Sequence, residues 1–259
     1  MYCVKEFIST FAYFAVLFMT KFHVVAFEIK GSEFAFVKLE EWKPCRNGSL
    51  HLEFKTTFEN VLIFYTDDGG INDYFELKLL RGLLHLVFDL GSGKMRMVVG
   101  ERLSDNEWHK VRIIRKETNI SLHVDDSSHS RSYQGKDQLF GIRDKKNNYV
   151  FIGGISKDYE DRTKALTLPP IFFETRFNGY IRNILYSNCG SPLFRPKILD
   201  SINMTMGPNE CIQNSPCLHN GVCLEEDDGV SCDCSYTNFR GDNCEIGKTL
   251  ITNPNLLTV

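Results

Sequence analysis

The sequence is poor in long apolar runs. Its 259 residues contain one such run, close to the amino terminus, and no later segment is long and apolar enough for a transmembrane helix. Low-complexity linkers and convincing amphipathic helices are also missing from the long central stretch. The formal net charge of −3 gives no general attraction for polyanions. We therefore expect a membrane link only through a segment downstream of this chain.

Sequence motifs of common hydrolases are missing as well. No serine lies in a Gly-x-Ser-x-Gly turn. A retaining glycosidase needs two carboxylates close together, but Glu53, Asp73 and Glu76 have no acidic residue four positions later. Three histidines fall on the polar faces of expected strands, where surface histidines are ordinary; they are His51, His85 and His123. We predict that the protein is not an enzyme.

Six of the nine cysteines crowd the C-terminal part of the chain: Cys211, Cys217, Cys223, Cys232, Cys234 and Cys244. Paired Cys-x-x-Cys or Cys/His clusters, which a zinc site would need, do not occur here. So short a unit cannot bury enough apolar surface, and it requires disulfides and an oxidising compartment. We predict export from the cell, which excludes nucleic acid as a partner. Spacing alone leaves about fifteen pairings of six cysteines open.

The amino terminus agrees with export. An apolar run over residues 7–19 is followed by small residues that end at Ala26, which predicts a cleaved signal peptide over residues 1–26. Lys21 and His23 are atypical residues between an apolar run and a cleavage site, so an uncleaved anchor is the alternative. Cleavage would remove Cys3 and leave an even number of cysteines. Three glycosylation sequons fit the same compartment; they begin at Asn47, Asn119 and Asn203.

Residues 27–206 show the two-residue period of β-strands. Leu50, Leu52 and Phe54 alternate with polar residues, and three later segments repeat the pattern. Turn signals separate many short runs, which predicts an antiparallel β-sandwich. Cys45 and Cys189 lie too far apart for an immunoglobulin Cys…Trp…Cys spacing, so we favour a jelly roll.

Five short motifs in this stretch occur in the order of a laminin-G-like domain: Leu62-Ile63-Phe64-Tyr65, Asp73-Tyr74-Phe75-Glu76-Leu77, Trp108-His109-Lys110-Val111, Phe151-Ile152-Gly153-Gly154 and Phe177-Asn178-Gly179-Tyr180-Ile181. The cysteine pattern, with Asn220-Gly221 and Phe239-Arg240-Gly241, resembles an epidermal-growth-factor (EGF) module. The expected fold is all-β, a laminin-G-like antiparallel jelly-roll sandwich followed by a small disulfide-rich EGF module.

The order of these parts resembles the amino-terminal portion of the α-type neurexin family. The expected domains are a signal peptide at 1–26, a laminin-G-like domain at 27–206, an EGF-like domain at 207–246 and a tail or linker at 247–259. The resemblance implies an extracellular adhesion module that binds protein partners at synaptic or cell–cell contacts. It also implies a chain that is secreted, or that forms the ectodomain of a longer presynaptic-type membrane protein. The alternative is a secreted glycan-binding, lectin-like matrix protein.

The resemblance also implies disulfide pairs within the EGF module, namely Cys211–Cys223, Cys217–Cys232 and Cys234–Cys244. This module lacks the calcium-binding pattern of some relatives, because Glu225 and Val230 stand at the Asp/Asn and aromatic positions. We expect it to space neighbouring domains. The two remaining cysteines, Cys45 and Cys189, are expected to pair because free thiols are a liability in a secreted protein.

The resemblance implies calcium as a cofactor, which would bind at one rim of the sandwich. It implies Asp73 as the carboxylate ligand and the carbonyls of Leu90 and Leu139 as further ligands. The position of the last side-chain ligand is Gly141, which offers none. Since calcium prefers several oxygen ligands, Asp73 as an ordinary strand-start residue is the alternative.

Two basic clusters could bind heparan sulfate, as in some laminin-G-like domains. The first contains Lys110, Arg112, Arg115 and Lys116, and the second contains Arg143, Lys145 and Lys146. Charge supplies most of such attraction, and salt weakens it. Ordinary solvated strand and turn residues are the alternative.

Overall fold

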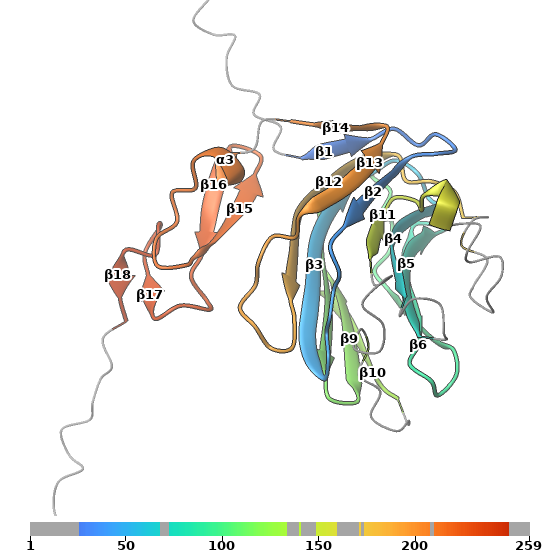
Figure 1. Ribbon diagram of the computed structural model, residues 1–259, viewed down its shortest axis with the longest axis horizontal. Coiled ribbons are helices and arrows are strands. Elements are labelled where there is room, and N and C mark those ends of the chain that lie inside the picture. Colours follow the sequence, from blue (N-terminus) through green and yellow to red (C-terminus); the bar gives the residue numbers. More distant parts are fainter. Residues whose placement is uncertain are drawn as a thin grey trace, which may run out of the picture.

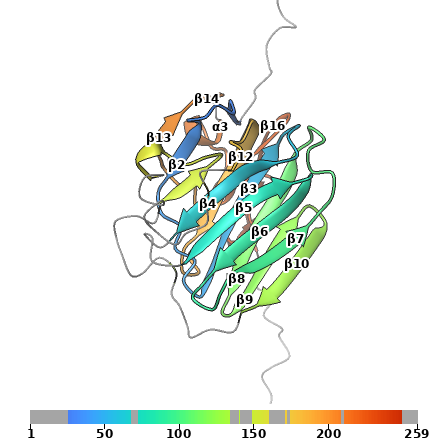
Figure 2. The same ribbon diagram turned by 90° about the vertical axis from the view of Figure 1, so that its right-hand side faces the viewer.

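Two seven-stranded antiparallel sheets pack face to face in the sandwich (Figures 1 and 2). They belong to a computed structural model that describes residues 26–67, 73–133, 140, 149–159, 171, 174–207 and 210–248. The all-β sandwich that the sequence predicts is therefore confirmed. No helix among the described residues is both long and apolar enough to cross a membrane.

Sheet A joins strands from both ends of the domain. Its spatial order is β10 (Ser127–Ser132), β9 (Asn119–Val124), β8 (His109–Lys116), β3 (Asn47–Lys55), β12 (Gly179–Ser187), β1 (Phe27–Ile29) and β14 (Met204–Met206). Because β1 pairs with both β12 and β14, the start and the end of the domain lie together.

Sheet B contains the hairpins of the middle of the chain. Its order is β13 (Ile198–Ile202), β2 (Phe36–Leu39), β11 (Val150–Ile152), β4 (Val61–Asp67), β5 (Tyr74–Leu80), β6 (Leu83–Asp89) and β7 (Met95–Val99). Each sheet therefore ends at one side in strands from the domain termini and at the other in a hairpin strand, β7 or β10.

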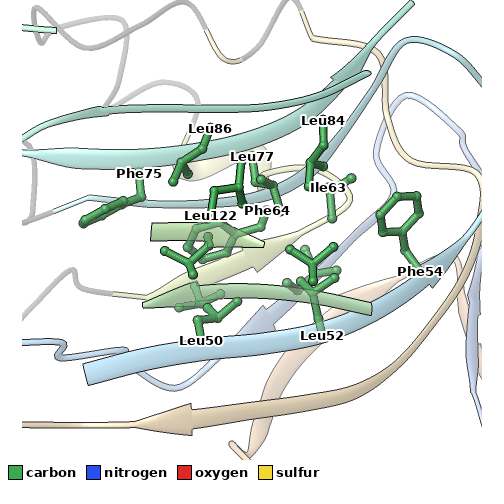
Figure 3. Packing of buried hydrophobic residues seen from close by; sticks show 14 of the residues in the cluster. Leu50, Leu52, Phe54, Ile63, Phe64, Phe75, Leu77, Leu84, Leu86 and Leu122 are labelled. Atoms are coloured by element: carbon green, nitrogen blue, oxygen red, sulfur yellow. The ribbon is translucent and has the colours of Figure 1, made fainter. Parts of the chain in front are cut away.

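The main core fills the space between the sheets (Figure 3). Leu50, Leu52 and Phe54 of β3 point toward sheet B, as their alternation with polar residues predicts. Trp42 packs edge-on against Phe75 with ring centroids 5.3 Å apart. Full burial of each such side chain stabilises the fold by about 1.5–3 kcal/mol.

A second apolar cluster covers the outer face of sheet B. Tyr65 and Phe151 lie there with Tyr159 from the segment after β11, so β4 is buried on both faces. The Tyr65 and Tyr159 hydroxyls donate to the buried Asp67 carboxylate over 2.9 and 2.5 Å. His85 on the same face is only 4% exposed, so its expected place on a solvated face is wrong.

The C-terminal module, for which the resemblance predicts an EGF-like fold, consists of the short helix α3 (Glu210–Gln213) and the hairpins β15 (Val222–Glu226) with β16 (Gly229–Asp233) and β17 (Phe239–Arg240) with β18 (Ile246–Gly247). Its disulfides join the pairs that the resemblance implies: Cys211–Cys223, Cys217–Cys232 and Cys234–Cys244. In the sandwich, a bond joins Cys45 to Cys189, whose Cα atoms lie 4.9 Å apart.

Candidate functional site

A bulge in β12 creates the contact between the sandwich and the C-terminal module. The register of β12 against β3 shifts between Arg182 and Leu185, and Asn183 takes a left-handed backbone conformation with φ of 53°. Asparagine tolerates this conformation better than most residues, and a bulge re-aims the side chains around it. As a result, Arg182 and Asn183 both contact the module.

Asn183 bonds to β15 in the way that a neighbouring strand would. Its Nδ2 donates to the carbonyl of Glu225 over 2.9 Å, and its Oδ1 accepts from the Glu225 amide over 2.8 Å. The Asn183 Nδ2 also donates to Glu53 over 3.2 Å. Asn183 and Glu225 are 3% and 1% exposed, so these bonds are shielded from water.

Arg182 adds the charged part of the same contact. Its Nε donates to Glu53 and its Nη1 to Asp227 of the module, both over 2.8 Å. The guanidinium also lies 4.1 Å from the centroid of the Trp108 ring, in the geometry of a cation–π contact. A buried guanidinium needs such partners, because it loses the water that would otherwise solvate it.

Arg195 completes the contact, which we call the seam: Glu53, Arg182, Asn183 and Arg195 of the sandwich with Cys223, Glu225 and Asp227 of the module. Its Nη2 donates to the Cys223 carbonyl over 3.2 Å. Figure 1 shows β15 and β16 beside β12 and β3, on the side away from sheet B. The expected spacer is thus fixed against its neighbour by buried polar contacts.

The basic residues of β8 do not form one surface patch. Because side chains alternate along a strand, Lys110 and Arg112 point outward while Arg115 points into the sandwich and is 1% exposed. The expectation that Arg115 contributes to an exposed cluster is therefore wrong. Lys110 Nζ lies 3.9 Å from carboxylate oxygens of both Glu53 and Glu226, at the border of the seam. The second cluster, at residues 143–146, lies outside the described residues.

The rim suggested for calcium brings two of its three expected residues together. Tyr74 pairs with Asp89 across β5 and β6, which places Asp73 opposite Leu90. Asp73 is 5% exposed and Leu90 is 1% exposed. Leu139, the third expected position, and Gly141 lie outside the described residues.

The two described residues supply only part of a calcium cage. Burial lowers the pKa of Arg115, and the nearby Tyr133 and Asp73 charges partly oppose that effect, so the Asp73 carboxylate already faces a guanidinium. The described residues contain no group of three His, Cys, Asp or Glu side chains that could hold a metal. Since calcium takes about six to eight oxygen ligands, its binding at Asp73 stays a prediction.

The three sequon asparagines differ in exposure. Asn47 and Asn203 are exposed, and Asn119 is partly buried at the start of β9. The amide nitrogen of Asn203 donates to the Ser32 hydroxyl, a bond that a glycan on the same nitrogen would have to accommodate. Glycosylation at all three positions stays a prediction.

Two histidines on the outer faces of the sheets, His51 and His85, have strongly lowered pKa values and are therefore neutral in the folded protein. Burial, followed by the charge of Arg112, lowers the pKa of His51 to about 4. Burial, followed by the charge of Arg96, lowers the pKa of His85 to about 4. The strand alternation predicts polar faces for His51 and His85 but does not indicate these arginine neighbours.

Comparison with known proteins agrees with this architecture. A family model described as "Laminin G domain" matches residues 54–188. Neurexin 1 of Drosophila melanogaster is 36% identical over 247 residues, which make up 86% of this chain and 13% of that protein. Neurexin-3a of Danio rerio is 28% identical over 217 residues, 84% of this chain and 12% of that protein. The chain thus spans a small part of the length of these relatives.

Solved structures give the same fold at lower sequence identity. Domains LG4-5 of the mouse laminin α1 chain match with a TM-score of 0.57 and 21% identity, over 78% of this chain and 49% of that one. The LG1-3 region of the laminin α2 chain matches with a TM-score of 0.56 and 17% identity, over 70% of this chain and 34% of that one. The motif order, the paired sheets and the family match lead to one conclusion: the chain belongs to the laminin G domain family and is a homologue of the neurexins.

Proposed function

We propose that this chain is an extracellular adhesion and recognition module, which binds protein partners at synaptic or other cell–cell contacts. The observation that carries the proposal is the similarity to Neurexin 1 over 86% of the chain. Four disulfides support an oxidising compartment. The chain acts there as a secreted protein or as the ectodomain of a longer membrane protein, and it has no enzymatic role.

An apolar surface beside the module supports a protein partner. Three large apolar side chains that are 37–60% exposed line one pocket of about 500 Å³ there: Ile198, Met206 and Ile212. Exposed apolar side chains that lie together are typical of protein interaction surfaces. We call these three residues the apolar edge, and we propose that a cell-surface protein covers it.

Binding to intact cells tests this function. The tagged protein should bind cells after heparinase treatment but not after protease treatment of the cell surface. The Ile198→Ser/Met206→Ser variant should bind at least tenfold more weakly, while the control Phe58→Ser, which changes an apolar residue 44% exposed on another loop, should bind normally. Equal binding of all three proteins would contradict a role of the apolar edge. Binding that heparinase abolishes would instead favour the glycan-binding alternative.

Calcium at the Asp73 rim is a separate part of the proposal, because Asp73 and Leu90 share one end of the sandwich. Asp73 would supply the carboxylate and Leu90 its carbonyl, and the bound ion would add positive charge at a rim of loops, where binding sites often lie. The basic residues of β8 give the glycan-binding alternative little support, since Lys110 borders the seam and Arg115 is buried.

A further inference from the structure

Three consecutive residues of the C-terminal module, Arg240, Gly241 and Asp242, place opposite charges on the two sides of a glycine. They lie at the end of β17, and all three are exposed. Figure 1 shows β17 and β18 on the side of the module that is distant from the sandwich. This tripeptide is therefore separate from the seam and from the apolar edge.

The fold of the module explains the glycine. The φ of Gly241 is 99°, a value that favours glycine, and a side chain there would collide with the Glu245 carboxylate. The amide of Cys244 donates to the Gly241 carbonyl over 3.3 Å, which closes a turn with Asp242 and Asn243 as its central residues. The turn thus presents the Asp242 side chain at the surface.

The strand period explains where Arg240 points. Phe239 stacks on His219 with ring centroids 3.5 Å apart, so the next side chain of β17, that of Arg240, lies on the opposite face of the hairpin. Arg240 pairs there with Ile246 of β18, whose side chain is 48% exposed. Side chains that are directly opposite each other share one face, so the guanidinium lies beside an exposed apolar group.

No contact within the described module uses the two charges. Among the described residues, no group of opposite charge lies within 4.0 Å of the charged atoms of Arg240 or Asp242, and neither side chain forms a hydrogen bond. The neighbouring carboxylate, that of Glu245, accepts from the Asn243 amide over 2.9 Å. The fold of the module therefore requires Gly241 but leaves both charged side chains available to a partner.

A short closed loop holds the tripeptide. The disulfide between Cys234 and Cys244, which are 10 residues apart in the sequence, encloses it. Inside the loop, the Thr237 hydroxyl donates to the Cys234 carbonyl over 2.9 Å and accepts from the Phe239 amide over 3.0 Å. Because the loop is already ordered, binding through it would cost less conformational entropy than binding through a flexible peptide.

The two charges require different groups on a partner. A guanidinium binds carboxylates through two parallel N–H donors, so Arg240 fits an acidic pocket. A free carboxylate is a good oxygen ligand for a divalent cation, so Asp242 fits a bound metal ion with an open coordination position. Extracellular modules hold calcium with dissociation constants of about 10⁻⁴–10⁻³ M, so such a cation is present where a disulfide-bonded protein works.

We propose that Arg240-Gly241-Asp242 binds an adhesion receptor for Arg-Gly-Asp sequences, in which a divalent cation takes the Asp242 carboxylate and an acidic pocket takes the Arg240 guanidinium. The exposed Ile246 beside Arg240 adds an apolar contact at the same surface. This inference rests on the extracellular role proposed above, but it does not depend on the apolar edge.

Cell attachment to the immobilised full chain tests the tripeptide, with cells that also attach to a surface coated with an Arg-Gly-Asp peptide. In millimolar magnesium, the soluble Arg-Gly-Asp peptide should inhibit attachment to the wild type, and the Arg-Gly-Glu peptide should not. The measured quantity is the attachment that the Arg-Gly-Asp peptide inhibits. Asp242→Glu keeps the charge but moves the carboxylate by one methylene, and we expect it to need at least about tenfold more protein for equal attachment.

The matched control is Asp228→Glu, which changes another exposed aspartate of the module, next to Gly229 in the turn between β15 and β16. It should match the wild type. Thermal unfolding and mapping of the Cys234–Cys244 bond check that both variants are folded.

Three results would overturn the proposal: attachment that the Arg-Gly-Asp peptide does not inhibit, equal peptide-sensitive attachment of Asp242→Glu and the wild type, or peptide-sensitive attachment that persists in a chelator. The Ile198→Ser/Met206→Ser variant should keep the peptide-sensitive attachment, and Asp242→Glu should keep the binding that depends on the apolar edge. Failure of the tripeptide and failure of the apolar edge therefore give different results.

Discussion

The seam and the groove between β7 and β10, which Arg96 and Arg131 line, both concentrate arginines on the sandwich, but the arginines differ in their partners. In the seam, Arg182 is 5% exposed and binds Glu53 and Asp227, each over 2.8 Å. In the groove, Arg96 is exposed and donates to the neutral His85. The first arrangement satisfies its charges within the chain, and the second leaves them for solvent or a ligand.

This difference separates a structural role from a recognition role. A partner that used Arg182 would have to displace two carboxylates and undock the module, which would cost the contacts of the whole seam. A ligand that used Arg131, which lines the groove between β7 and β10, would have no carboxylate of the described residues to displace. Charge alone therefore does not identify a binding surface, and the pairing of each charge must be known.

The largest expected effect comes from breaking the seam. Arg182→Met removes the guanidinium and leaves Glu53, which is 5% exposed, as a buried carboxylate without its main partner. We expect a loss of about 3–5 kcal/mol in the free energy of unfolding, measured by chemical denaturation. The second variant, Glu53→Gln/Arg182→Met, should recover part of that loss because it removes the uncompensated charge. A single variant as stable as the wild type would show that the seam charges do not hold the module.

The strands and the module could be predicted from the sequence because their signals are local. The alternation around Leu52 predicts β3, and the spacing of Cys223 and Cys232 is typical of the hairpin β15–β16. The seam could not be predicted, because nothing beside Asn183 indicates a bulge and the bulge has a function only once Glu225 lies next to it.

The Asp73 rim and strand β8 could also be predicted only in part from the sequence. The pairing of β5 with β6 brings Asp73 and Leu90 to one end, as the resemblance implies. The neighbouring Arg115 changes the electrostatics of that end, and its inward orientation follows from a strand period that starts at His109. The strand period alone places Arg115 on the inner face, but it could not show that Asp73 would lie near it.

A smaller effect should come from the neutral part of the seam. Asn183→Gly keeps the left-handed backbone conformation available but removes both side-chain bonds to Glu225. We expect a loss of about 1–3 kcal/mol. Hydrogen exchange of the Glu225 amide should become much faster, while exchange in the core strand β5 should stay slow. Unchanged protection at Glu225 would contradict the pairing between Asn183 and β15.

Acid should weaken the folded protein through its neutral histidines. The pKa of His51 and that of His85 are each lowered from 6.5 to about 4, mainly by burial. The unfolded state therefore binds more protons between these values, and stability falls as the pH drops from about 6.5 toward 4. Chemical denaturation at several pH values should show a smaller slope in His51→Gln than in the wild type. Equal slopes would mean that His51 titrates normally in the folded state.

The smallest expected effect concerns the Asp73 rim, where the chain again sets a carboxylate against a guanidinium. With calcium removed by a chelator, Asp73→Asn should lower the free energy of unfolding by about 1 kcal/mol, because Arg115 loses a facing charge. Calorimetry with millimolar calcium then separates the two roles of Asp73. A binding heat that the wild type shows and Asp73→Asn lacks would establish the metal site. A loss of stability without such a heat would mean that Asp73 serves Arg115 as Glu53 serves Arg182 in the seam. Asp73 would then neutralise a charge of the chain itself and would not bind calcium.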